Sequence, residues 1–133
     1  MNIGLQTAAE LMTKQLITIG PGETLRSAAA LMDKHHIHCL LIPADPPSRC
    51  VGIITTKDIV QVVCEGEPAM LDQLTVRDAE TRPALSVQSG FTVQECLRLM
   101  RMSGVRSVPV FEGVSLVGLL SFTDVLRAVA REE

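Results

Sequence analysis

The chain is poor in aromatic residues: its 133 residues include no Trp, no Tyr and only three Phe. Base-stacking platforms and aromatic ligand cages need exposed rings, so neither is expected here. No apolar run approaches the roughly 20 residues of a membrane span. A secretory signal requires a positive side chain before its apolar stretch, but no positive side chain precedes Lys14 in this sequence. A formal net charge of −3 argues against general nucleic-acid binding. We therefore expect a cytoplasmic globular protein without a membrane or nucleic-acid partner.

Catalytic and cross-linking signatures are also missing. The sequence contains no GxSxG elbow, no Walker loop, no GxGxxG and no HExxH motif, so we expect no enzyme activity. We interpret the cysteines as buried free thiols, because they lie in apolar stretches without CxxC spacing, and we predict neither a disulfide framework nor a zinc knuckle. The cysteines are Cys39, Cys50, Cys64 and Cys96.

What the chain does contain is an internal duplication. A shift of 68 residues places Thr7 on Thr75, and after a two-residue contraction a shift of 66 residues places Asp58 on Asp124. A unit of about 60 residues buries too little apolar surface to be stable alone, so two such repeats should share one core. The predicted repeats and the polar connector between them are residues 7–64, 75–131 and 65–74.

Both repeats show the same order of elements: strand, helix, strand, strand, helix. Thr24 and Thr92 are the predicted N-caps of the first helices, whose apolar residues recur at helical spacing, and Thr92 forms a capping box with Glu95. This order predicts an α/β fold. The other predicted strands and helices cover residues 16–19, 39–42, 51–54, 57–64, 108–111, 116–120 and 123–131.

One segment in each repeat carries candidate chemistry. Residues 52–58 and 118–124 both read as Gly, two apolar residues, a hydroxyl, two variable positions and then Asp at a helix start. Hydroxyl-x-x-acid is the capping-box pattern and needs no ligand. Alternatively, the helix N-terminus would attract a phosphate, and the Asp carboxylate would accept both hydroxyls of a ribose. Both interpretations stand; among ligands, a nucleoside phosphate fits better than a bare anion or a metal.

The duplicated unit resembles a pair of CBS domains, together called a Bateman module, over about Thr7 to Val129. The resemblance implies two β-α-β-β-α repeats related by a pseudo-twofold axis, with the sheets packed together and the helices outside. It also implies a non-catalytic sensor that binds an adenosine-containing ligand in clefts between the repeats and commonly forms a disk-like homodimer. The segments that carry it are Ala9–Thr13, Thr18-Ile19, Leu31-Met32, Val105–Val110 and the two Gly…Asp segments.

The resemblance also assigns roles to individual residues. Asp58 and Asp124 would hold the ribose, and Thr55 and Ser121 the phosphate. His38 and Arg106 align across the repeats at a position that is often basic in the family and faces the phosphate. The remaining ligand-binding candidates are Ile17, Thr18, Leu85 and Ser86 near the base, Pro109 on the Val-Pro-Val strand, and Lys57 and Thr123 at the helix starts.

Two departures from the family pattern bear on these roles. Pro43 is displaced by two positions relative to Pro109, which predicts a differently shaped cleft in the first repeat. Glu80 follows Ala79 where the family usually has Met after an apolar residue, which predicts weaker packing there. Because the second repeat has the fuller pattern, we expect the Asp124 site to contribute more to binding than the Asp58 site.

The supply of cations restricts the choice of ligand. Few are available, which favours AMP or ADP over ATP, with S-adenosylmethionine and NADH as further adenosyl ligands. No cofactor is required, and the sequence does not identify the partner protein that would be regulated. The candidate cations are Lys57, Arg106, His38, Lys14 and Arg82.

Two alternative functions fit parts of the sequence. The first is a structural dimerisation module whose Asp residues only cap helices. The second is a metal protein, because His35, His36, His38 and Cys39 offer zinc or copper ligands within five residues. In an extended strand, however, His38 and Cys39 point to opposite faces and cannot reach one ion, so we predict no metal site.

A homodimer is expected on physical grounds as well. The predicted helix that starts at Lys57 has apolar residues on more than one side, and such a helix has a second apolar face left to cover. These residues are Ile59, Val60, Val62 and Val63.

Overall fold

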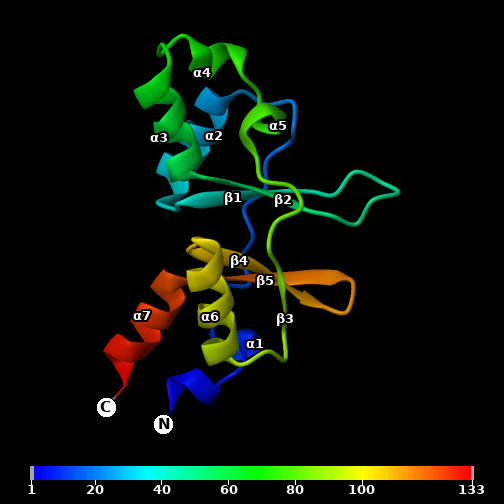
Figure 1. Cartoon of the computed structure of the whole chain (residues 1–133), viewed down its shortest axis with the longest axis vertical. Helices are drawn as coiled ribbons and strands as arrows, with labels where there is room; N and C mark the ends of the chain where they lie inside the picture. Colours follow the sequence, from blue (N-terminus) through cyan, green and yellow to red (C-terminus); the bar gives the residue numbers. More distant parts are fainter. Residues whose placement is uncertain (1, 133) are drawn as a thin grey trace. The chain divides into compact units, whose positions relative to one another are not determined.

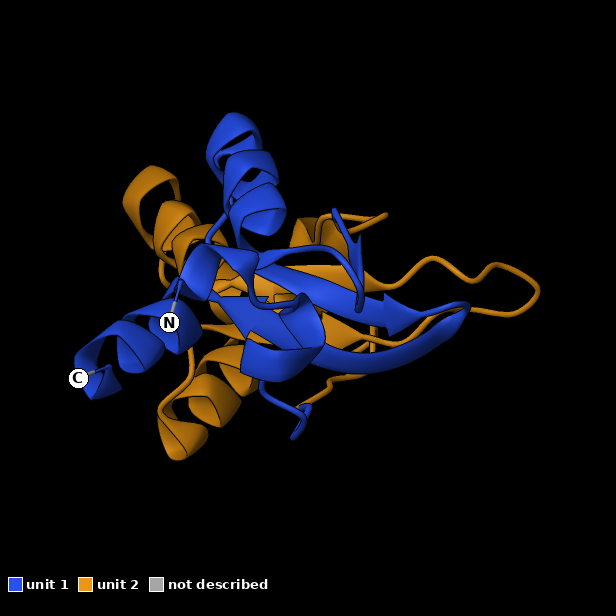
Figure 2. Ribbon diagram, turned by 90° about the horizontal axis from the view of Figure 1, so that it is seen from below, with its two compact units in different colours: residues 1–16, 85–133 blue, residues 17–84 orange. Residues whose placement is uncertain are grey.

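The computed structural model describes residues 2–132 and divides the chain into two compact units (Figure 2). Unit 1 comprises Met1–Leu16 and Leu85–Glu133, and unit 2 comprises Ile17–Ala84. Both combine helices with a small sheet, labelled in Figure 1, which confirms the predicted α/β fold class. No helix within residues 2–132 is long and apolar enough to span a bilayer.

Unit 2 is built on the antiparallel pair β1–β2, in which Cys39 lies opposite Thr55 and Ile42 opposite Gly52. All four residues of β1 are buried, and Leu40 and Ile42 pack with the apolar face of α2 in one core cluster. The elements of this unit are α2 (Leu25–His35), β1 (Cys39–Ile42), β2 (Gly52–Thr55), α3 (Thr56–Glu65), α4 (Met70–Gln73) and α5 (Val76–Ala79).

Unit 1 has a sheet in the order β3-β4-β5, with β3 parallel and β5 antiparallel to β4. Its core cluster joins Val108, Val110 and Leu120 from the sheet with Cys96 and Met100 from α6. Its elements are the 3₁₀ helix η1 (Ile3–Leu5), α1 (Ala8–Leu11), β3 (Val87–Gln88), α6 (Val93–Ser103), β4 (Ser107–Glu112), β5 (Ser115–Ser121) and α7 (Phe122–Arg131).

The units and the sequence repeats divide the chain differently. The N-terminal segment belongs to unit 1, where the N–H of Ala8 donates to the carbonyl of Phe91 at 2.8 Å. The matching segment after the connector belongs to unit 2, where the N–H of Val76 donates to the carbonyl of Glu23 at 2.8 Å. Each repeat therefore contributes its opening helix, α1 or α5, to the unit that holds the sheet of the other repeat.

Most predicted elements agree with the structure to within a residue or two, and both predicted N-caps are confirmed. The strand predicted at 16–19 is wrong: only Thr18 pairs, in an isolated parallel bridge to Leu41. The polar connector is also more structured than predicted, because it contains the whole of α4. Arg26 holds this helix through two hydrogen bonds to the carboxylate of Asp72.

The cysteine prediction is half correct. All four thiols are free, and Cys39 and Cys96 are buried, but Cys50 and Cys64 are exposed. Cys50 lies on the loop after β1, and Cys64 on the outer side of α3. Burial raises the pKa of the Cys96 thiol to about 11, so that thiol stays protonated and unreactive at neutral pH.

Glu80 is buried, although it aligns with the apolar Met12 of the first repeat. Its side chain is 2% exposed and pairs with Arg82, whose Nε lies 2.6 Å from Oε1. The same guanidinium donates to the carbonyls of Cys50 and Pro43, so it ties the loop after β1 to the end of α5. Gly52 is needed here, because a Cβ at this position would lie 2.0 Å from Oε1 of Glu80.

We predict that Arg82→Ala destabilises the protein by roughly 3 kcal/mol, because it leaves the Glu80 carboxylate buried without its closest cation. The matched control is Arg26→Ala, which breaks an ion pair whose two side chains are 56% and 57% exposed. Exposed pairs contribute little, so the control should change stability far less. Urea denaturation followed by circular dichroism measures both; equal losses would contradict the prediction.

Candidate functional site

The starts of α3 and α7 are the repeated feature that the sequence singles out. At α3, the carboxylate Oδ2 of Asp58 accepts from the N–H of Thr55 at 2.8 Å and from its hydroxyl at 3.0 Å. At α7, Oδ2 of Asp124 accepts from the N–H and hydroxyl of Ser121 at the same two distances. Both are complete capping boxes, so each hydroxyl and carboxylate is held in place at its helix start.

Backbone hydrogen bonds join each helix start to the residue immediately before a strand, β1 in unit 2 and β4 in unit 1. The N–H of Thr56 donates to the carbonyl of His38 at 2.9 Å, and the N–H of Phe122 donates to the carbonyl of Arg106 at 3.0 Å. The side chains of His38 and Arg106 are exposed beside these helix starts. These backbone bonds therefore place a basic residue beside the hydroxyl and Asp of the cap in both units, and the ligand contacts that the resemblance assigns to these residues stay predictions.

The predicted ligand residues fall into two separate sets. Each unit contains its own helix start, its own basic strand residue and its own segment before the sheet, and no residue is shared. Pro109 is fully buried in β4, so it shapes the fold from within and presents no exposed surface. Unit 2 holds Ile17, Thr18, His38, Thr55, Lys57 and Asp58; unit 1 holds Leu85, Ser86, Arg106, Pro109, Ser121, Thr123 and Asp124.

The two Asp residues differ in their remaining partners. Asp124 is buried, and its Oδ1 accepts from the hydroxyl of Thr13 at 2.7 Å and lies 3.5 Å from a guanidinium nitrogen of Arg127. Asp58 is only half-buried, and its Oδ1 has no partner in the part of the chain that the structure describes. Both helix starts have the same capping hydrogen bonds, but the two Asp carboxylates differ in their other contacts.

Sequence reasoning missed Thr13 and Arg127 as neighbours of the candidate site. Thr13 lies 111 residues before Asp124, and an isolated backbone bridge to Leu119 brings it there. A signal was present, because the repeat aligns Thr13 with Thr81, which bridges to Ile53 in the same way. Arg127 follows Asp124 by three residues on α7, a spacing at which helical side chains meet.

Two of the predicted cations differ in availability. Arg82 is committed to Glu80 and to two backbone carbonyls, so it has no free face for a phosphate. Lys57 is exposed at the first turn of α3, next to the candidate site.

The histidine segment does not form a metal-binding cluster. His35, His36 and His38 are exposed, whereas Cys39 is buried in β1, as expected for neighbours on opposite faces of a strand. Within residues 2–132, no group of three or more His, Cys, Asp or Glu side chains could hold one metal ion.

Capping boxes also occur where no ligand is expected. Three further helices begin with the same reciprocal bonds, so the hydroxyl-x-x-acid pattern by itself does not indicate a binding site. What is particular to α3 and α7 is that a strand leads directly into the cap and that a basic residue is bonded beside it. The other three boxes are Thr7 with Glu10, Thr75 with Asp78 and Thr92 with Glu95.

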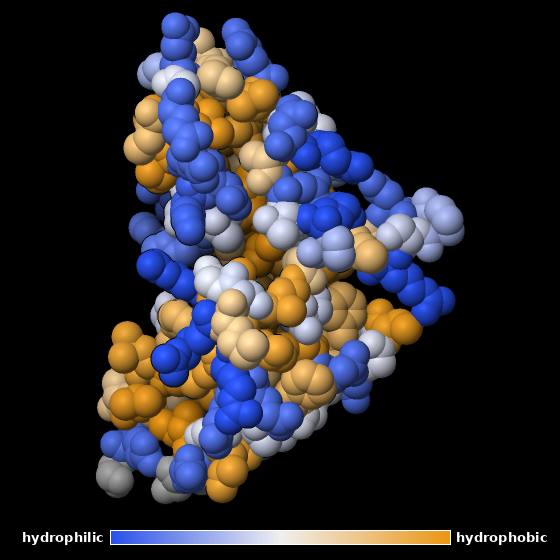
Figure 3. Space-filling model, viewed as in Figure 1, coloured by the Kyte–Doolittle hydropathy of each residue, from blue (hydrophilic) through white to orange (hydrophobic). Residues whose placement is uncertain are grey.

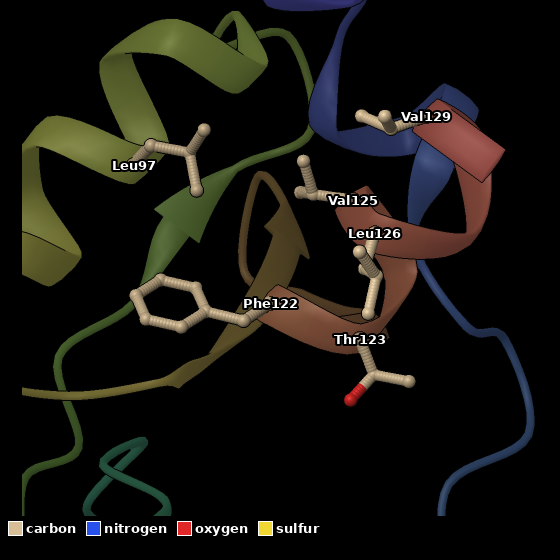
Figure 4. A pocket seen from close by; sticks show the side chains of 6 residues that line it. All are labelled: Leu97, Phe122, Thr123, Val125, Leu126 and Val129. Atoms are coloured by element: carbon tan, nitrogen blue, oxygen red, sulfur yellow. The ribbon is translucent and has the colours of Figure 1, made fainter. Parts of the chain in front are cut away.

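An apolar groove lies between two of the longer helices in each unit. In unit 1, a hollow of about 460 Å³ is lined by one side chain of α6 and five of α7 (Figure 4). In Figure 3, apolar side chains reach the surface over α7, at the lower left of the view. The matching hollow in unit 2, between α2 and α3, adds Asp33, His36 and His38 to its apolar lining. The lining in unit 1 is Leu97, Phe122, Thr123, Val125, Leu126 and Val129.

Comparison with known proteins identifies the repeats. The family model of the CBS domain matches residues 8–65 and 76–131. Hypoxic response protein 1 of Mycobacterium tuberculosis is 34% identical over 125 residues, which cover 92% of this chain and 85% of that protein. An uncharacterized protein of Methanopyrus kandleri is 29% identical over 123 residues, 91% of this chain but only 61% of that protein.

Solved structures share the fold. A crystal structure of hypoxic response protein I with two coordinated zinc ions superposes with a TM-score of 0.72 at 30% identity, over 92% of this chain and 98% of that one. The CBS domain pair of protein MJ0100, solved in complex with 5′-methylthioadenosine and S-adenosyl-L-methionine, gives a TM-score of 0.81 at 23% identity, over 97% of this chain and 99% of that one. With the family matched in both repeats, the chain belongs to the CBS domain family and is a CBS domain pair, a regulatory module.

Proposed function

We propose that this CBS domain pair senses an adenosine-containing ligand, AMP or ADP, at the helix starts of Thr55–Asp58 and Ser121–Asp124. The observation that carries the proposal is the repetition of one local arrangement in both units: hydroxyl, carboxylate and basic strand residue at a helix N-terminus. The chain itself has no catalytic motif, which suits a sensor that changes a partner's activity by binding.

The phosphate end of the ligand would lie at the helix N-terminus. There the first N–H groups lack intrahelical acceptors and the helix dipole favours negative charge. At α3, Thr56 and Asp58 donate to protein acceptors, which leaves the N–H of Lys57 for a phosphate oxygen. The hydroxyl of Thr55 has one proton and now donates it to Asp58, so it would turn toward the phosphate on binding.

The ribose and the base complete the assignment. A carboxylate accepts hydrogen bonds from two neighbouring hydroxyls, as the ribose diol requires. The base would be held by backbone and aliphatic groups such as Ile17, because the chain has no Trp or Tyr to stack on it. A CBS pair of the same fold, that of protein MJ0100, holds two adenosyl compounds, which supports this choice of ligand class.

The charge near each helix start favours few phosphates. His38 and Lys57 are basic side chains at the start of α3, and Arg106 and Arg127 are basic side chains at the start of α7, while Arg82 is bonded elsewhere. A triphosphate needs several converging cations to offset its charge. We therefore place AMP and ADP before ATP.

We predict that AMP or ADP raises the thermal stability of the protein. A ligand that binds only the folded state contributes about 2.7 kcal/mol at a concentration of 100 Kd. Differential scanning fluorimetry with AMP, ADP, ATP, S-adenosylmethionine and NADH measures this shift. A melting temperature that stays constant at millimolar concentrations of all five would favour the alternative of a structural module without ligand.

We predict that the double variant Asp58→Asn/Asp124→Asn weakens AMP binding at least about tenfold, because each Asn loses the negative charge and an acceptor oxygen. Asp78→Asn is the matched control, since Asp78 forms the same capping box with Thr75 at the start of α5. Isothermal titration calorimetry compares the variants. If the control lost as much affinity as the double variant, the effect would come from helix capping and not from ligand contact.

We further propose that the protein is a homodimer in which the apolar groove of α6 and α7 packs against a second copy. The exposed apolar residues Leu126 and Val129 line this groove, and no element among the described residues covers them. A second copy presents the same apolar surface and can cover it, as in the isologous interfaces of most homodimers.

We predict that Leu126→Asp converts the dimer to a monomer, because it introduces a charge into the apolar interface. Val114→Asp is the control: Val114 is 67% exposed, like Leu126 at 68%, but lies in the turn between β4 and β5. Sedimentation equilibrium at micromolar concentration should find a dimer for the parent and the control and a monomer for Leu126→Asp. A parent that is monomeric throughout would refute the dimer.

A further inference from the structure

The acceptor positions of the two Asp carboxylates are occupied to different extents. A carboxylate offers about four lone-pair positions. At Asp58, the N–H and hydroxyl of Thr55 fill two, and Oδ1 keeps two open. At Asp124, Ser121 fills two and the hydroxyl of Thr13 fills a third, while a guanidinium nitrogen of Arg127 lies 3.5 Å from Oδ1. A ribose diol brings two O–H donors, so it matches the two open positions of Asp58 but finds only one at Asp124.

The difference comes from side chains, because the backbone hydrogen bonds beside the two Asp residues follow the same pattern in both units. Thr13 exchanges backbone hydrogen bonds with Leu119, and Thr81 exchanges them with Ile53 in the same pattern. Only the hydroxyl of Thr13 reaches its Asp, and among the described residues Asp58 has no such donor.

The two Asp carboxylates also differ in whether a cation lies beside them. The residue that aligns with Arg127 in the first repeat is Gln61, whose amide donates to Glu65 at 3.2 Å. Gln61 therefore makes no hydrogen bond to Asp58, and among the described residues no cation forms an ion pair with Asp58 as Arg127 does with Asp124.

We propose that the two sites are unequal: Asp58 takes the ribose diol first, and Thr13, assisted by Arg127, keeps the Asp124 site weak by occupying its acceptors. This inference rests on the proposed function and deepens it, since it assigns an order of occupancy to the two sites. Turning of the cap hydroxyl toward a phosphate would free one position at either site, so the difference between the sites persists. The order is the reverse of the one that the fuller pattern of the second repeat predicts.

Single variants test the order of occupancy. AMP is titrated calorimetrically into the parent, Asp58→Asn and Asp124→Asn, with circular dichroism to verify folding. Asp58→Asn should weaken the tighter binding event tenfold or more, whereas Asp124→Asn should leave it within twofold. A greater loss in Asp124→Asn, or equal losses in both variants, overturns the inference. A parent that binds no AMP overturns the proposed function itself and the inference with it.

Thr13→Val tests the role of the hydroxyl, and it stays informative if Asp124→Asn does not fold. In an Asp58→Asn background, where the Asp124 site is the one observed, Thr13→Val should strengthen AMP binding about tenfold, equivalent to 1.4 kcal/mol. The control is Thr81→Val, whose hydroxyl does not contact Asp58 and whose effect on AMP binding should be negligible.

A ligand that lacks part of the diol distinguishes two explanations of the gain in affinity: an acceptor position freed on Asp124, or a general loosening of the structure. The gain from Thr13→Val should disappear with 2′-deoxy-AMP, which lacks one hydroxyl of the diol. An unchanged or weaker affinity for AMP in Thr13→Val, or an equal gain with 2′-deoxy-AMP, overturns the role assigned to Thr13.

Discussion

Capping of a helix by the acidic side chain of its own first turn is the interaction on which the rest of this structure depends. In α3 and α7 the cap joins the end of a strand to the start of a helix without an intervening loop. It orders a hydroxyl and a carboxylate within 3.0 Å of each other at the positive end of the helix dipole. The capping hydrogen bonds and the proposed ligand contacts therefore use lone pairs of the same carboxylates. The ligand can use only the lone pairs that the capping bonds leave open.

A second constraint is the exchange of opening helices between the units. Val76 of α5 is fully buried in the core of unit 2, and Ala8 of α1 is fully buried in the core of unit 1. Neither repeat therefore completes a core with its own residues alone. This explains physically why about 60 residues suffice for each unit, although a separate domain of that size would be marginal.

Sequence reasoning succeeded where the signal is local and repeated. Thr24 and Thr92 marked helix starts, the runs at Cys39–Ile42 and Val108–Phe111 marked strands, and the alignment of Asp58 with Asp124 marked two equivalent capped helix starts. It failed where tertiary context decides. A β-branched stretch at residues 16–19 pairs through a single bridge, Cys64 turns outward on its helix, and Glu80 is buried only because Arg82 pairs with it. The contact of Thr13 with Asp124 spans most of the chain; the alignment of Thr13 with Thr81 marks the position in both repeats but does not distinguish the one hydroxyl that reaches an Asp.

The helix exchange also bears on how the gene can be divided. A cut in the connector would yield two fragments, each carrying the sheet of one unit and the opening helix of the other. Neither fragment could bury its apolar surface by itself, but together they would restore both cores without a covalent link.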